Sequence, residues 1–125
     1  MKINLKVIYI ILILIFINSC DRDNSMNNIK FANRTILYAG AVGKDIPLEP
    51  VCQISQPEES NSSVYCEAKY DHKGRLVVFT MYNNGSVFFT QTITYDGDSM
   101  NLVIFRNSEG KITMQKRKGM DIEYF

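Results

Sequence analysis

The chain has 125 residues, a length that fits one domain, and 46% of them are hydrophobic. Its 14 basic and 13 acidic residues give a formal net charge of +1. This balance lacks the basic stripe and high isoelectric point of nucleic-acid-binding domains, so we expect no nucleic-acid partner. Much of the hydrophobic content lies at the amino terminus, which differs in kind from the rest.

Residues 1–19 have the layout of a secretory signal peptide. Lys2 and Lys6 supply a positive start, and Val7 to Ile17 form an apolar run. The run is shorter than the ~20 apolar residues that a membrane-spanning helix needs. We therefore predict a cleaved signal peptide. The alternative, an uncleaved anchor, is disfavoured by the net acidic residues 21–23 that follow the run.

The apolar run ends on Ile17-Asn18-Ser19-Cys20. This order, an aliphatic residue, a tolerant position, a small residue and then cysteine, resembles the lipobox of bacterial lipoproteins. The resemblance covers only the first twenty residues. It implies cleavage before Cys20, a diacylglycerol on the Cys20 thiol and an acyl chain such as palmitate on the new amino group. Several acyl chains on one residue hold a protein stably at a membrane.

The alternative is that Cys20 is an ordinary cysteine after a conventional cleavage site. The chain has three cysteines, so a secreted form would then keep an odd one.

A polar segment without periodicity, DRDNSMNN, occupies residues 21–28. We predict a flexible tether over residues 20–30 and a folded domain over residues 31–125. In enterobacterial-type lipoproteins an aspartate directly after the lipidated cysteine resembles the signal for inner-membrane retention, and Asp21 holds that place. We therefore expect a lipid-anchored protein of the cell envelope that faces the periplasm, at the inner membrane in preference to the outer.

Short apolar stretches follow the tether at residues 36–39, 51–54 and 64–66, separated by segments rich in Gly, Pro and Ser. They are typical of strands joined by loops. The longest of these loops, SQPEESNSS, covers residues 55–63.

In the second half, glycine turns recur at intervals of 11, 12 and 13 residues, at Gly74, Gly85, Gly97 and Gly110. Runs rich in β-branched and aromatic residues lie between them, at 75–82, 86–95, 100–106 and 111–116. No stretch after residue 20 shows helical periodicity. The pattern predicts an all-β domain, a small antiparallel meander that closes into a barrel or a sandwich.

Alternation along these runs predicts which side chains share a face. In the run 86–95, one face carries Val87, Phe89, Ile93 and Tyr95. In the next two runs the corresponding residues are Met100, Leu102 and Ile104, followed by Ile112 and Met114. Phe88 and Phe89 are neighbours, so either the sheet is covered on both sides or one ring is exposed.

Cys52 and Cys66 flank the long polar loop, and we predict a disulfide between them because the periplasm is oxidising. Closing a loop of about 15 residues stabilises a fold by roughly 3 kcal/mol. The alternative is a metal or redox pair. The single histidine and the absence of Cys-x-x-Cys disfavour it, so we expect no metal and no cofactor.

The sequence shows no catalytic constellation. His72 lies in a predicted turn, and Glu58-Glu59 lies in the polar loop, where solubilising charge is the simpler interpretation. Gly40 and Gly43 are not followed by the Lys-Ser/Thr of a phosphate-binding loop. We therefore predict a non-enzymatic protein without a small-molecule substrate.

Two features suit binding. The first is a basic cluster near the carboxyl terminus, Lys111, Lys116, Arg117 and Lys118, which suits an acidic partner or lipid headgroups or is an ordinary charged strand end. The second is the aromatic content of the predicted strands, which serves the core or a recognition patch: Tyr65, Tyr70, Phe79, Tyr82, Phe88, Phe89, Tyr95 and Phe105.

Residues 94–116 carry a partial resemblance to a second family. Tyr95, the Asp96-Gly97 turn, Val103-Ile104-Phe105 and Glu109-Gly110 are similar to the tail of the membrane-bound lysozyme inhibitors, which are small β-barrel lipoproteins. The inhibitory Ser-x-Ser-Gly-x-x-Tyr loop of that family is absent, because residues 90–95 read Thr-Gln-Thr-Ile-Thr-Tyr. A cysteine near the carboxyl terminus is also absent. The resemblance implies a shared architecture, and no inhibitory residue is carried over.

We therefore predict a membrane-anchored, periplasm-facing lipoprotein that binds an unidentified protein, in an inhibitor or immunity-type role. Small size, the lack of catalytic groups and tethering near the site of attack favour that role. The alternative is an accessory lipoprotein, pilotin-like or for assembly, of an envelope secretion, pilus or conjugation system.

Overall fold

The computed structural model describes residues 26–60 and 62–125. The predicted signal peptide, Cys20 and Asp21 lie outside these residues. In the described part, no helix has the length and apolar character needed to span a membrane.

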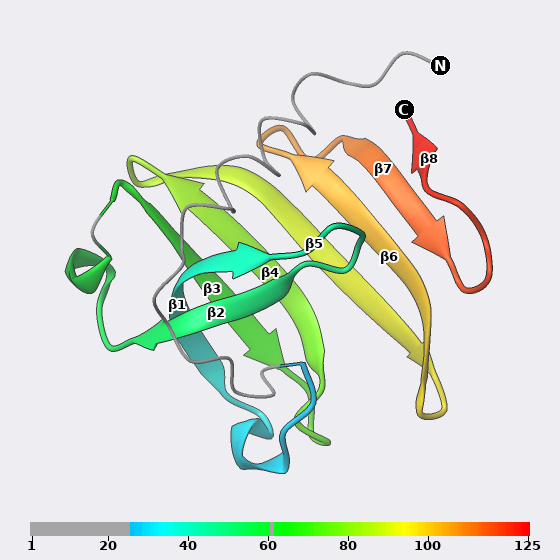
Figure 1. Cartoon of the computed structure of the whole chain (residues 1–125), viewed down its shortest axis with the longest axis horizontal. Coiled ribbons are helices and arrows are strands. Elements are labelled where there is room, and N and C mark those ends of the chain that lie inside the picture. Colours follow the sequence, from blue (N-terminus) through cyan, green and yellow to red (C-terminus); the bar gives the residue numbers. More distant parts are fainter. Residues whose placement is uncertain (1–25, 61) are drawn as a thin grey trace.

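One antiparallel sheet of eight strands forms the domain, in the order β2-β1-β3-β4-β5-β6-β7-β8 (Figure 1). The strands are β1 (Thr35–Val42), β2 (Glu49–Ile54), β3 (Val64–Tyr70), β4 (Leu76–Asn83), β5 (Ser86–Asp96), β6 (Ser99–Asn107), β7 (Ile112–Arg117) and β8 (Glu123–Tyr124). Two single turns of 3-10 helix accompany them, η1 (Ile29–Phe31) and η2 (Pro57–Glu59). The predicted all-β meander is confirmed from β3 onward, and the four predicted glycine turns join its successive strands from β3 to β7.

The strand β1 decides how the sheet is shaped. Residues Thr35 to Tyr38 pair with β3, whereas Leu37 to Val42 pair with β2. β1 therefore leaves β3 halfway along its length, and the β1–β2 hairpin crosses over β4 and β5 (Figure 1). The result is one open sheet whose edge hairpin covers part of its own inner face.

The core lies between this hairpin and the inner face of the meander. Its members are fully or almost fully buried, and the largest include Leu76, Phe79, Met81, Val103 and Phe105. Ile46 and Leu48 enter the core from the loop between β1 and β2.

A polar residue that the alternation pattern did not single out ties the hairpin to the sheet. Gln91 of β5 is 0% exposed. Its amide oxygen accepts a hydrogen bond from the Leu48 backbone N–H at 2.7 Å, and its amide nitrogen donates to the Leu48 carbonyl at 3.2 Å. The side chain thus satisfies both backbone groups of a buried residue that no strand pairs.

The inward faces were only partly predicted. Phe89 and Ile93 point inward as expected, but Val87 is 36% exposed. On β6 the buried residues are Val103 and Phe105, because the register places them opposite Ile93 and Gln91. Directly opposed residues of an antiparallel pair share a face. Of the predicted inward set, Leu102 and Ile104 therefore lie on the outer face, and Met100, beyond the register shift at Thr94/Tyr95, is 38% exposed. Of the last pair only Met114 is buried.

A β-bulge explains the Phe88-Phe89 pair. Met81 of β4 pairs with Phe89 and Tyr82 pairs with Val87, so Phe88 is the extra residue. A bulge of this kind re-aims a side chain. Both rings consequently contact the core, with their centroids 5.9 Å apart in an edge arrangement.

The predicted disulfide between Cys52 and Cys66 is wrong. Cys66 of β3 is a free thiol and is fully buried, which raises its pKa. Tyr38 of β1 pairs with Cys66 on one side and with Gln53, the neighbour of Cys52, on the other. The two cysteines are thus two strand spacings apart, roughly 10 Å. A disulfide spans at most ~7 Å between Cα atoms.

Among the described residues, contacts with the domain are already present at Met26, five residues before the predicted boundary at Phe31. The Leu76 backbone N–H donates to the Met26 carbonyl at 3.1 Å, and the Asn28 N–H donates to the Gly74 carbonyl at 2.9 Å. The segment lies so close to the β3–β4 turn that a Cβ at Gly74 would stand 2.1 Å from the Asn28 carbonyl oxygen.

Candidate functional site

The residues weighed as catalytic candidates lie apart. His72 is exposed in the β3–β4 turn. Glu59 is in η2 and accepts a hydrogen bond from the Ser55 backbone N–H at 2.6 Å, so it caps its own loop. Within residues 26–60 and 62–125, no three His, Cys, Asp or Glu side chains are grouped as metal ligands would be.

The four basic residues near the carboxyl terminus do not form one patch. Lys111 precedes β7 and lies 3.6 Å from Glu109, whereas Lys118 follows the far end of the strand. Lys116 reaches the other way and forms an ion pair with Asp45 in the loop between β1 and β2. β7 therefore distributes these charges over both of its ends and both of its faces.

Most of the predicted aromatic residues belong to the core. The exception is a pair on the outer surface, Tyr65 of β3 and Tyr82 of β4, whose rings stack with centroids 4.9 Å apart. Both are half-buried, and desolvation followed by the charge of Glu67 raises the pKa of Tyr82. Two stacked rings on adjacent strands are an ordinary cross-strand pair.

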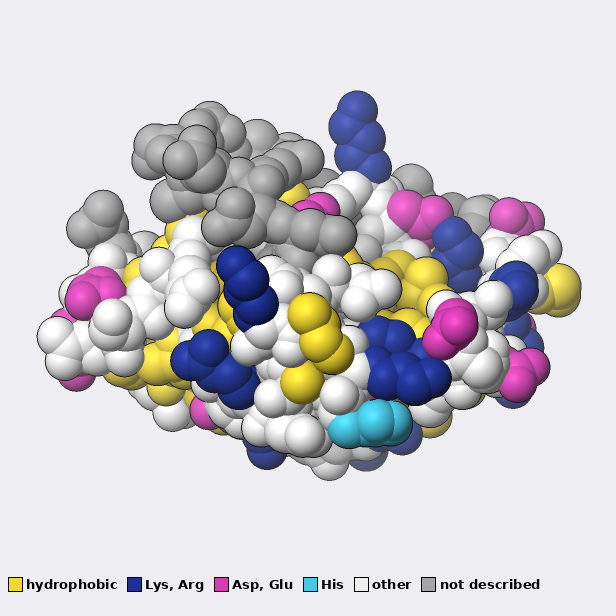
Figure 2. Space-filling view, turned by 90° about the horizontal axis from the view of Figure 1, so that it is seen from below, with side chains coloured by type: hydrophobic (Ala, Val, Ile, Leu, Met, Phe, Trp, Pro, Cys, Tyr) yellow, Lys and Arg dark blue, Asp and Glu magenta, His cyan; other side chains and the backbone are white. Residues whose placement is uncertain are grey.

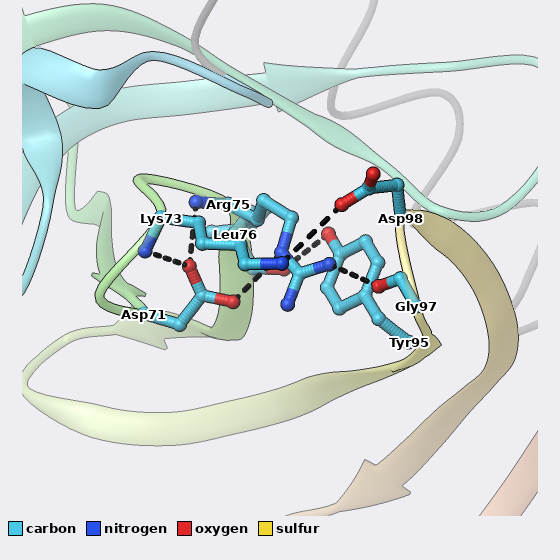
Figure 3. A network of polar contacts seen from close by, with 7 residues as sticks. All are labelled: Asp71, Lys73, Arg75, Leu76, Tyr95, Gly97 and Asp98. Carbon is cyan, nitrogen blue, oxygen red and sulfur yellow. Dashed lines mark hydrogen bonds and ion pairs between the residues drawn. The ribbon is translucent and has the colours of Figure 1, made fainter.

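A polar network joins two turns at one end of the sheet (Figure 3). Arg75 donates to the Asp71 carboxylate at 2.9 Å and to the Gly97 carbonyl at 2.6 Å, and its guanidinium lies 4.3 Å from the ring centroid of Tyr95. The Tyr95 hydroxyl in turn donates to the Leu76 carbonyl at 2.7 Å. These partners all belong to the domain, so we assign the network to stability.

The network stabilises the ionised carboxylate of Asp71. Partial burial acts to raise its pKa, but hydrogen bonds from the backbone and side chain of Arg75 and from the Lys73 backbone lower it below the usual range.

The feature that best suits recognition is the edge of the sheet formed by β8. β8 pairs with β7 through Tyr124 opposite Met114, and the Phe125 N–H extends the pairing to the Thr113 carbonyl at 2.9 Å. In the described part of the chain, no strand pairs with the other side of β8. Its outward N–H and C=O groups therefore form a free edge.

Large hydrophobic side chains surround this edge. Ile112 and Tyr124 are each 39% exposed, and Phe125 is 65% exposed. Tyr124 lies opposite the buried Met114 and therefore lies on the inner face, whereas a register shift at Phe105/Arg106 places Ile112 opposite Arg106. The ion pair between Lys116 and Asp45 marks how far the covering hairpin reaches, and β8 lies beyond the hairpin in Figure 1.

We call Ile112, Tyr124, Phe125 and the free backbone edge of β8 the C-terminal edge. Such an edge can accept an extended peptide as an additional strand while its apolar side chains contact alternate residues of that peptide. The sequence analysis did not single out β8. A usable signal is the alternation Ile122-Glu123-Tyr124, which is too short to outweigh a loop assignment.

No known protein family, curated protein or solved structure matches this chain.

Proposed function

We propose that the chain is a lipoprotein of the bacterial cell envelope, anchored through lipid on Cys20, whose β-domain binds another protein at the C-terminal edge. Within this class we favour an inhibitor or immunity-type role over an enzymatic one. The observation that carries the binding proposal is the exposure of Tyr124 and Phe125 beside a free strand edge. The anchor rests on the lipobox-like residues 17–20 alone.

Exposed hydrophobic residues at an open strand edge are normally avoided, because they invite association with other chains. The other edge of the sheet, β2, is irregular, with Pro50 in the strand and Cys52 at a φ of 66°. β8 has no positive φ or proline, and two exposed aromatic residues lie at its end, Tyr124 in the strand and Phe125 directly after it. Aromatic residues are also the type enriched at binding hot spots.

The chemistry around the edge favours an extended, acidic and apolar segment as the ligand. Lys111 lies next to Ile112, and Arg117 lies at the other end of β7 with its side chain exposed. Negative residues flanking an apolar strand would therefore be attracted from both ends of β7, while hydrogen bonds to β8 would set the register.

Affinity capture tests the binding site. The full chain is captured from membranes as the wild type, as the double variant Tyr124→Ser/Phe125→Ser, and as Val87→Ser. Val87 is a matched control, because it is 36% exposed but belongs to the β4–β5 hairpin. We expect a captured protein to fall by about ten-fold or more for the double variant, as for the loss of a hot spot, and to stay unchanged for Val87→Ser.

Equal capture by all three proteins would refute the C-terminal edge as the site. Recovery of a secretion, pilus or conjugation component as the partner would contradict the inhibitor role and favour an accessory one.

The anchor is tested separately by metabolic labelling with palmitate. Wild-type protein should carry the label and Cys20→Ser should not, and label that persists in the variant would refute the lipobox. Intact mass adds a second criterion. A mass without acyl chains would contradict the anchor, and a mass two hydrogens below that of the reduced chain would show in addition that two of the three cysteines form a disulfide.

A further inference from the structure

The most exposed large hydrophobic residue of the described part lies where the chain enters the domain. Ile29 in η1 is 71% exposed. η1 packs on the β3–β4 turn, since the Asn28 N–H donates to Gly74 and the Asn33 N–H donates to the Asp71 carbonyl at 2.9 Å. Asn28 lies so close to this turn that a Cβ at Gly74 would stand 2.1 Å from its carbonyl oxygen. Ile29 is therefore held outward by a fixed backbone and is not the end of a loose segment.

Three exposed basic residues lie at the same end of the sheet as Ile29. Lys30 and Arg34 follow it in sequence, and Lys69 pairs with Thr35, so all three lie at the same end of the sheet, where they are exposed. We call Ile29, Lys30, Arg34 and Lys69 the η1 surface. Figure 2 views this end of the molecule and shows exposed hydrophobic side chains with lysine and arginine on both sides.

Acidic residues do not cancel this charge. Asp71 is paired with Arg75 at 2.9 Å, and Asp98 in the β5–β6 turn lies 3.4 Å from Lys73. The members of the η1 surface form none of the ion pairs found among the described residues.

We infer that the η1 surface faces the membrane and contacts anionic phospholipid headgroups, with Ile29 entering the interface. The inference rests on the proposed anchor at Cys20. Six Cα steps separate Cys20 from Met26, the first described residue, whose carbonyl is hydrogen-bonded to Leu76, and this limits the separation to about 22 Å. The end of the domain that the tether reaches is thus the end that carries both an exposed aliphatic residue and exposed lysine and arginine, a combination that binds anionic bilayer surfaces.

This orientation also separates the two binding surfaces. η1 and the carboxyl terminus lie at opposite ends of the molecule in Figure 1. With the η1 surface on the bilayer, the C-terminal edge points away from it and stays accessible to a protein partner.

Fluorescence provides a direct test, because the sequence contains no tryptophan. Ile29→Trp and, as a control, Val87→Trp are introduced separately into the full lipid-anchored protein. Each is reconstituted into vesicles that contain brominated lipid, with either phosphatidylglycerol or only phosphatidylcholine. Contact with the interface predicts quenching of Ile29→Trp that is at least about two-fold stronger than that of Val87→Trp. We also expect weaker quenching of Ile29→Trp without phosphatidylglycerol and after Lys30→Glu/Arg34→Glu.

Equal quenching of the two tryptophans, or quenching that does not depend on the anionic lipid, would overturn the inference. Flotation of the vesicles separates the two proposals. A protein that floats while its Ile29→Trp is unquenched overturns only the orientation. A protein that does not float overturns both the anchor and the orientation.

Discussion

The side chain of Gln91 provides the sharpest test of how this fold is held together. It is the one polar residue among the fully buried positions of the described chain, and it bonds both backbone groups of Leu48. Replacing it by leucine, Gln91→Leu, keeps a similar volume but leaves the Leu48 N–H and C=O without partners. The β1–β2 hairpin then loses its polar link to β5.

The cost follows from the two orphaned groups. Each buried and unsatisfied backbone group costs about 1–3 kcal/mol, so the pair costs about 2–6 kcal/mol before any relaxation. The hydrophobic gain of leucine offsets part of this, and we expect a net loss of about 3 kcal/mol. For a domain of this size such a loss lowers the melting temperature by about 12–24 °C.

A second variant, Gln91→Glu, tests the direction of the hydrogen bonds. Its new carboxyl can replace the amide fully only when protonated, because only then can it donate to the Leu48 carbonyl. Burial raises the pKa of this carboxyl above its value of about 4.3 in the unfolded chain. A raised carboxyl pKa means that the folded state binds more protons, so the stability of the variant decreases as the pH rises from about 4.3 to the folded pKa.

The assay is urea denaturation followed by circular dichroism, from pH 4 to pH 8. Thr92→Val serves as the control, because Thr92 is the neighbour of Gln91 on the outer face and should change stability by less than about 0.5 kcal/mol. If Gln91→Leu is as stable as the control, or if Gln91→Glu gains stability relative to the wild type as the pH rises, the proposed link between the hairpin and the sheet is refuted.

Three further outcomes are expected. Asp71→Asn should lower the free energy of unfolding by about 2 kcal/mol at neutral pH. Because the folded pKa of Asp71 is lowered, the stabilisation by its carboxylate is present above about pH 4 and is lost as the pH falls through that folded pKa. The free energy of unfolding of the variant should therefore fall less steeply in acid than that of the wild type. Cys66 should react with a thiol reagent only in denaturant. Reaction of Cys66 in the native protein would contradict its burial. The absence of any reactive thiol after denaturation without reductant would contradict a free cysteine. Gly74→Ala should destabilise the fold by more than about 3 kcal/mol, whereas Gly85→Ala should destabilise it by about 1 kcal/mol. Both glycines have a φ near 80°, but only Gly74 faces the Asn28 backbone. Equal losses of stability, measured by thermal unfolding, would show that the segment around Asn28 is not packed on the β3–β4 turn.

The local pattern of the second half predicted its strands well. The glycine turns at Gly74, Gly85, Gly97 and Gly110 and the β-branched runs between them depend on preferences of a few adjacent residues, and each run became a strand within one or two residues of its predicted ends. The candidate functional site was less predictable, since exposure of Tyr124 and Phe125 depends on where the covering hairpin stops.

Where both the odd-numbered and the even-numbered residues of a strand are apolar, the alternation pattern does not show which face of the strand is buried. β6 has Leu102 and Ile104 at one parity and Val103 and Phe105 at the other. The choice was made by the register with β5, which a bulge at Thr94/Tyr95 shifts. A bulge depends on both strands of a pair, so one strand alone does not reveal it.

By itself, the sequence determined the fold class and the strand-and-turn plan from β3 to β7, because these arise from contacts between residues close in the chain. Tertiary structure alone decided that β1 pairs with both β2 and β3, and this position of β1 separates Cys52 from Cys66. It also decided that Gln91 is buried against Leu48, 43 residues away. Both depend on pairing across a distance that no local preference encodes. The same pairing left β8 as a free edge and placed η1 at the opposite end, and these are the two surfaces on which the proposed partner and the proposed membrane contact depend.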